Sequence, residues 1–153
     1  LQEQHGNFSN LSFLRQLPVD IHLATEQVVS NLKTLRPGGI ICCGMAEKRK
    51  TLTIESQARC HQECLYSIVN IPELIKSLAF THISHDAGKF VCEGLYYQLL
   101  KYFQSLPQTI PCIFVHVPIL NHSNQKLIQQ DLNSIIKYLE QIITNHKRRS
   151  PEL

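Results

Sequence analysis

Ser84-His-Asp-Ala-Gly-Lys-Phe-Val-Cys-Glu-Gly-Leu-Tyr-Tyr97 is the stretch around which the rest of the chain can be arranged. Its turn, Asp86-Ala87-Gly88, separates a short strand-like run from a segment with helical spacing. Apolar residues after the turn recur at the intervals of one buried helix face: Val91, Leu95, Leu99 and Tyr102. The stretch therefore predicts a strand, a turn and a helix, with Cys92 in the first helical turn.

Cys92 occupies a position in which a thiol can become reactive. The unpaired N–H groups of a first helical turn and the positive end of the helix dipole favour an anion. A cysteine placed there can have its pKa lowered and be partly thiolate near neutral pH. A small buried thiol is the more common role of an intracellular cysteine. This stretch alone leaves both interpretations open.

Strands and helices alternate on both sides of this unit. The apolar patterns predict strands over residues 40–44, 51–54, 81–84 and 112–117, and helices over 24–35, 72–79 and 125–144 besides the one after Cys92. Residues 17–21 are predicted to form a short extended segment, and residues 1–14 and 56–70 to be mostly irregular. This alternation predicts an α/β fold, a three-layer α/β/α sandwich with a mostly parallel (mixed) sheet, and one domain over residues 1–153.

Composition and charge narrow the class of protein. The chain is 43% hydrophobic and 18% charged, as in folded globular proteins, and its formal charge is only +3. Because no apolar run reaches the length of a membrane span and the basic cluster His146–Arg149 is short, we expect no membrane and no nucleic-acid partner. We interpret that cluster as a solvated tail. Cysteines in apolar runs (Cys42, Cys43 and Cys112) suit reduced thiols and a cytoplasmic location.

Three chemically useful residues follow or end predicted strands. Glu55 ends the strand over 51–54, Cys92 follows the one over 81–84, and His116 lies near the end of the one over 112–117. Working residues of α/β sheets collect at the carboxyl ends of strands, so we expect these three on one edge. A thiol, an imidazole and a carboxylate suit nucleophilic acyl transfer. A solvated strand end for Glu55 and a hydrogen-bonded core position for His116 are the simpler alternatives.

The motifs around these residues resemble those of one enzyme family. The segment Asp86–Cys92, read as Asp-Ala-Gly-x-Phe-Val-Cys, is similar to the active-site segment of pyroglutamyl peptidase I, also called pyrrolidone-carboxylate peptidase. Phe114-Val115-His116-Val117-Pro118 resembles the family's histidine segment, and its His follows the Cys by 24 positions. The segment Gly44–Glu55, with Arg49 inside it, resembles a third family motif. The resemblance covers roughly residues 15–145.

This resemblance implies a cysteine peptidase that removes an N-terminal pyroglutamate from peptides through a thioacyl-enzyme, with no metal and no organic cofactor. By position, Cys92 matches the nucleophile, His116 the base and Glu55 the residue that orients the histidine. The residues that match the pocket for the pyrrolidone ring are Phe90, Val91 and, through its backbone, Met45. The expected partners are peptides with an N-terminal pyroglutamate, and family members are often homo-oligomers.

The chain also departs from the family pattern. The family's N-terminal strand and following loop have no counterpart here, so the chain is expected to be N-terminally incomplete, and Glu47-Lys48 replaces a Gly-Gly pair. A non-catalytic or weakly active member of the same fold, acting as a binding or oligomeric protein, is therefore the alternative. Half of a zinc site at Cys60-His61 and Cys64 is a weaker reading, since no second ligand pair at matching spacing is present.

Overall fold

A four-stranded sheet forms the centre of the molecule in the computed structural model, which describes residues 10–149. Its strands have the order β1-β6-β2-β5. β1 and β6 are parallel, β2 and β5 are parallel, and β2 and β6 are antiparallel. The predicted mixed sheet is thus confirmed, with two halves that run in opposite directions. The strand bounds are Ile40–Met45 for β1, Leu52–Glu55 for β2, Thr81–Ser84 for β5 and Cys112–Val117 for β6.

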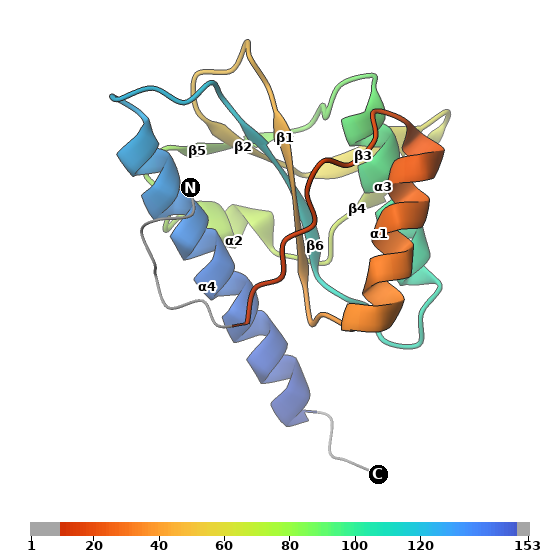
Figure 1. The fold of residues 1–153 in the computed structure, drawn as a ribbon. Helices are drawn as coiled ribbons and strands as arrows, with labels where there is room; N and C mark the ends of the chain where they lie inside the picture. Colours follow the sequence, from red (N-terminus) through yellow and green to blue (C-terminus); the bar gives the residue numbers. More distant parts are fainter. Residues whose placement is uncertain (1–9, 150–153) are drawn as a thin grey trace.

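Helices cover both faces of this sheet, which confirms the predicted α/β/α layers (Figure 1). One face packs against α1 (Ile21–Leu35) and α3 (Val91–Gln104), and the other against α2 (Ile71–Ile75) and α4 (Gln125–Arg149). Alternate residues of β6 enter the two cores, since Phe114 faces α1 and α3 whereas Val115 faces α2 and α4. Because β6 lies in the middle of the sheet, its polar residues are held deep in the molecule.

The start of α1 differs from the prediction. The expected extended segment over residues 17–21 is wrong, because the helix begins at Ile21 rather than at residue 24. Asp20 is its N-cap, and the Asp20 carboxylate accepts a hydrogen bond of 2.8 Å from the backbone N–H of Leu23. An aspartate in this role supplies one of the partners that a first helical turn lacks. Of the irregular region predicted over 1–14, residues 1–9 lie outside the described part of the chain.

The prediction that residues 56–70 are mostly irregular is wrong. They contain an antiparallel hairpin of two strands, β3 (Gln57–Cys60) and β4 (Glu63–Tyr66). Its turn includes His61 at φ 52°, a left-handed conformation that glycine or asparagine usually supplies. Ala58 and Leu65 are buried in the core beside α3, so the hairpin is held by packing rather than by a recognisable turn sequence.

α2 ends at Ile75, earlier than predicted. The N–H groups of Lys76, Ser77 and Leu78 still bond to carbonyls three residues back, whereas those of Ala79 and Phe80 bond to α4. The carboxylate of Asp131, on α4, accepts hydrogen bonds from the backbone N–H groups of Ala79 (3.1 Å) and Phe80 (2.7 Å) and from the Thr81 hydroxyl (2.6 Å). Asp131 is buried. This carboxylate therefore ties α4 to the start of β5.

α4 is longer than predicted and runs to Arg149. The basic cluster that we interpreted as a tail is consequently helical, and His146, Lys147 and Arg148 are exposed in the last turns of the helix. Cations at this end are favoured by the negative end of the helix dipole. No helix within residues 10–149 has both the length and the apolar character needed to cross a membrane.

Candidate active site

His116 and Glu55 meet on the sheet face that α1 and α3 cover. In the antiparallel pairing of β2 and β6, Thr53 lies opposite His116 and Glu55 lies opposite Phe114. Glu55 is therefore diagonal to His116 on the same face, and its Oε1 lies 2.7 Å from the Nδ1 of His116. Because β2 runs against β6, the expectation that the carboxyl ends of the three strands share one edge is corrected. The residues still come together, but on a face.

Cys92 lies in the first turn of α3, as predicted, next to the ends of β1 and β6. A Cβ atom added at Gly44 would lie 2.9 Å from the Cys92 sulfur and 3.0 Å from the Phe114 ring. Only a residue without a side chain leaves room there for the thiol. The Cys92 thiol acts on the pKa of His116, so the two side chains lie close together. The structure thus brings Cys92, His116 and Glu55 into one row.

The surroundings of His116 favour its protonated form. Its side chain is only 6% exposed, and this burial alone would lower the pKa. The hydrogen bonds with Cys92 and Glu55 and the negative charge of Glu55 outweigh burial and raise the pKa of His116 to about 9. At neutral pH the imidazole is therefore a cation, which is the partner that a thiolate nucleophile needs.

Glu55 is fully buried, so the solvated strand end considered for it is wrong. Its Oε1 accepts hydrogen bonds from both His116 and Arg49, each at 2.7 Å. Within the described residues its Oε2 is buried without a hydrogen-bond partner. The hydroxyl of Tyr96, from α3, donates to the backbone carbonyl of Glu55 at 3.2 Å and fixes the strand beneath the carboxylate.

Arg49 is the residue of this site that the sequence reasoning missed. Residues 47–50 are four charged residues in a row, and such a run usually faces water. Arg49 instead turns inward, and only 25% of its side chain is exposed. Its place in the segment Gly44–Glu55, which resembles a family motif, was the available signal.

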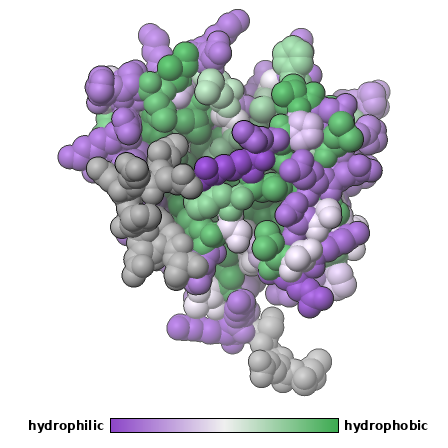
Figure 2. Space-filling model, viewed as in Figure 1, coloured by the Kyte–Doolittle hydropathy of each residue, from purple (hydrophilic) through white to green (hydrophobic). Residues whose placement is uncertain are grey.

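The predicted substrate-binding residues have less defined surroundings. Met45, at the end of β1, is 72% exposed, and Phe90, which precedes α3, is 82% exposed. Val91 is half-buried and packs against the core. Figure 2 shows hydrophobic side chains along the upper part of the molecule, where Figure 1 places the ends of β1 and β6 and the start of α3. The roles of these residues in binding stay predictions.

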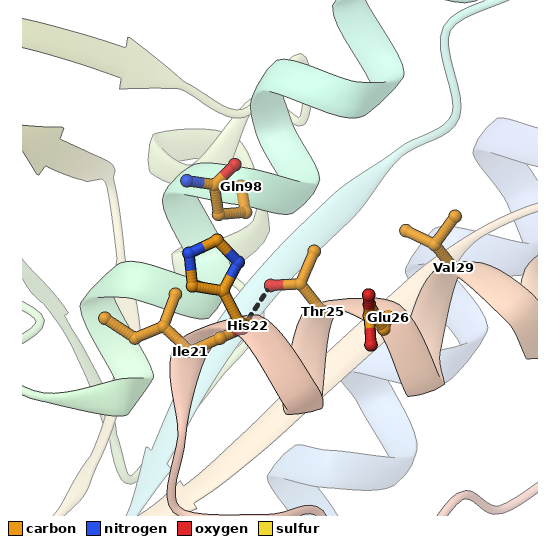
Figure 3. A pocket seen from close by; sticks show the side chains of 6 residues that line it. All are labelled: Ile21, His22, Thr25, Glu26, Val29 and Gln98. Atoms are coloured by element: carbon orange, nitrogen blue, oxygen red, sulfur yellow. Dashed lines mark hydrogen bonds between the residues drawn. The ribbon is translucent and has the colours of Figure 1, made fainter.

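A hollow of the described chain lies away from these residues. It has a volume of about 210 Å³ and opens between α1 and α3, where His22 of α1 faces Gln98 of α3 (Figure 3). None of Glu55, Cys92 and His116 lines it. Within residues 10–149, no three His, Cys, Asp or Glu side chains are grouped in a way that could hold a metal ion.

A thiol at a helix start, a buried imidazole and a buried carboxylate in one row make up the type of site found in cysteine hydrolases. No protein-family model matches the chain. Individual proteins do. A pyrrolidone-carboxylate peptidase of Bacillus cytotoxicus is 26% identical over an alignment 174 positions long, which covers 94% of this chain and 80% of that protein. A pyrrolidone-carboxylate peptidase of Brachyspira hyodysenteriae is 25% identical, and the alignment covers 91% of this chain and 84% of that protein.

Solved structures give the same result for the fold. A mutant pyrrolidone carboxyl peptidase of Pyrococcus furiosus superposes with a TM-score of 0.72 at 18% identity, covering 82% of this chain and 79% of that one. The pyroglutamyl peptidase I of Bacillus amyloliquefaciens gives a TM-score of 0.68 at 19% identity, with 78% and 75% covered. The chain is thus a relative of the pyrrolidone-carboxylate peptidases in sequence, and it has their fold.

Proposed function

We propose that this protein is a cysteine omega-peptidase that removes an N-terminal pyroglutamate from peptides through a thioacyl-enzyme intermediate. The observation that carries the proposal is the row of Cys92, His116 and Glu55, with the thiol in the first turn of α3. The pyrrolidone-carboxylate peptidases named above support the choice of substrate.

The acylation step uses three features of the site. The Cys92 thiolate attacks the carbonyl carbon that joins the pyroglutamyl residue to the rest of the peptide, forming a C–S bond. The oxyanion that develops faces the first turn of α3, whose N–H groups receive no side-chain cap among the described residues. The C–N bond then breaks, and His116 gives its proton to the leaving amine.

Deacylation reverses the role of the histidine. The neutral His116 takes a proton from a water molecule, which attacks the thioester carbonyl and releases pyroglutamate with the Cys92 thiolate as leaving group. Glu55 holds the imidazole by its Nδ1 throughout, so that Nε2 remains available to the thiol and the substrate. This assignment of Glu55 as an orienting residue is part of the proposal.

The substrate class follows from the chemistry of a pyroglutamyl group. Its ring is apolar, and it has no charged α-amine, so apolar walls with a few backbone hydrogen bonds would select it. We assign Phe90, Val91 and the backbone of Met45 to this pocket. The exposed position of Phe90 and Met45 favours a second possibility, a non-catalytic or weakly active protein of the same fold that binds partners or forms oligomers.

A hydrolysis assay separates these two functions. The purified chain is expected to release the fluorophore from a pyroglutamyl coumarin amide, and Cys92→Ala is expected to abolish that release without changing the thermal unfolding temperature. A proline coumarin amide, which has a similar ring but a protonated amine, serves as the control substrate. Absence of turnover in a folded wild-type protein would favour the binding protein over the enzyme.

Three further assignments accompany the proposal. We assign a cytoplasmic location, because all six cysteines are free thiols, as is usual in a reducing compartment. The protein is proposed to form homo-oligomers and to consist of one domain over residues 1–153.

A further inference from the structure

Arg49 lies in the loop between β1 and β2 and reaches three acceptors. Its Nη1 donates to Glu55 Oε1 at 2.7 Å and to the hydroxyl of Thr53. Its Nη2 donates to the backbone carbonyl of Asp86 at 2.8 Å. A quarter of the side chain is exposed, and the bonds to Thr53 and Glu55 are partly buried, whereas the bond to Asp86 is exposed. Such charge-assisted bonds are stronger than those between neutral groups.

The acceptors of Arg49 belong to two different parts of the site. Thr53 and Glu55 are on β2, whereas Asp86 begins the turn that leads to α3 and Cys92. That turn is ordered by its own bonds, because the Asp86 carboxylate accepts from the N–H of Gly88 at 2.9 Å. The guanidinium therefore joins the strand that carries the carboxylate to the segment that positions the thiol.

The carboxylate of Glu55 depends on Arg49 for its orientation. Both of its charged partners, Arg49 and His116, bind to Oε1, and Oε2 has no partner among the described residues. A carboxylate that is bound at only one oxygen can rotate about its Cγ–Cδ bond. Donors on two sides of that oxygen, here Arg49 and His116, restrict this rotation. The groups that act on His116 are Cys92, Glu55 and Arg49, and the positive charge of Arg49 lowers the pKa of His116.

We infer that Arg49 is a positioning residue of this site, which fixes Glu55 toward His116 and fastens the Asp86 turn that places Cys92. Its fork of donors is essential to the role, because a guanidinium can bind two acceptors in fixed directions and an ammonium is a point charge. The expected effect on turnover rests on the proposed peptidase function. The expected effect on the arrangement of Glu55, His116 and Cys92 does not depend on that function.

Two substitutions separate the charge of Arg49 from its shape. Arg49→Lys keeps the charge and loses the fork, and Arg49→Gln loses both. Both variants are expected to lower kcat by about 10- to 100-fold, as is usual when a group that orients a functional residue is removed. Lys50→Gln, in the same loop at an exposed position, is the matched control and is expected to retain wild-type kcat.

The effect of the Arg49 charge is measured by titrating His116, with NMR of histidine-labelled protein as the readout. In Arg49→Gln the midpoint is expected to move to higher pH, because a cation that opposes protonation has been removed. In Lys50→Gln it is expected to stay at the wild-type value. A wild-type midpoint in Arg49→Gln would overturn the assigned contact with the Glu55–His116 pair.

The effect of the guanidinium fork is measured by the rate at which iodoacetamide alkylates Cys92 at a fixed pH. This rate is normalised to the amount of folded protein. We expect this rate to differ from wild type in Arg49→Lys as well as in Arg49→Gln. A wild-type alkylation rate in Arg49→Lys would refute the bridge to Asp86. Because neither NMR nor alkylation requires turnover, these results remain decisive if the protein hydrolyses no pyroglutamyl amide, an outcome that would refute the proposed function alone.

Discussion

Replacing Gly44 by alanine tests whether the Cys92 thiol must lie where the structure has it. The new Cβ would lie 2.9 Å from the Cys92 sulfur and 3.0 Å from the nearest atom of the Phe114 ring. Non-bonded heavy atoms prefer separations of about 3.5–4.0 Å, so the thiol would have to move by roughly 0.6–1.1 Å. Phe114 is buried and packs on His116 with ring centroids 4.9 Å apart, so little of the strain can be relieved in its direction.

A displacement of this size is large for catalysis and small for folding. A misplacement of about 1 Å can reduce a rate by about 100-fold, and overpacking in a core typically costs about 1–3 kcal/mol of stability. Gly44→Ala is therefore expected to lower kcat/KM for a pyroglutamyl coumarin amide by about 100-fold while the protein remains folded by circular dichroism.

Gly39→Ala is the matched control, because its Cβ would meet Ile143 at 3.0 Å and a Pro111 side-chain atom at 3.3 Å, away from the thiol. It is expected to lower the unfolding temperature to a similar extent and to leave kcat/KM per folded molecule unchanged. The reasoning would be refuted if folded Gly44→Ala retained kcat/KM within about threefold of wild type, or if both variants lost activity equally.

Two further expectations concern stability. Because the pKa of His116 is raised from 6.5 to about 9 in the folded protein, the stabilisation from its protonation should be complete below about pH 6.5 and lost as pH rises through about 9. Urea unfolding of wild type and His116→Gln between pH 6 and 10 measures this, and parallel pH profiles would contradict it. Asp131→Asn should lower the free energy of unfolding by about 2–3 kcal/mol, because a buried carboxylate with three donors loses its charge. An unfolding temperature of Asp131→Asn equal to that of wild type would argue against a stabilising role for Asp131. As a control, the rate of Cys92 alkylation in Asp131→Asn should equal the wild-type rate at a temperature where both proteins are folded.

The parts of the fold that depend on nearby residues could be predicted from the sequence. The runs at β5 and β6 are bounded by turns, and the face of α3 repeats at helical spacing, so Cys92 could be placed in a first helical turn. The hairpin of β3 and β4 could not be predicted, because its turn uses His61 in a left-handed conformation and has no glycine or asparagine to mark it.

The features that depend on distant partners escaped prediction. The opposite directions of β2 and β6 are set by how the sheet assembles, and local apolar patterns carry no information on strand direction. The inward turn of Arg49 is stabilised by Glu55, six positions along, and by the Asp86 carbonyl, 37 positions along. A run of charges predicts exposure unless such partners are known, so only the resemblance of the segment Gly44–Glu55 to a family motif pointed to this residue.

The order of strands has a consequence for how the protein is made. β6 is the last strand to be synthesised, yet it lies between β1 and β2 and supplies the middle of both cores. Until residues 112–117 have left the ribosome, β1 has no neighbour in the four-stranded sheet and Glu55 has no histidine beside it. Assembly of the sheet, and of the site on it, must therefore wait until residue 117 has left the ribosome. Until then the apolar residues that will pack on β6 are without their central partner, which is the condition in which nascent chains aggregate or bind chaperones.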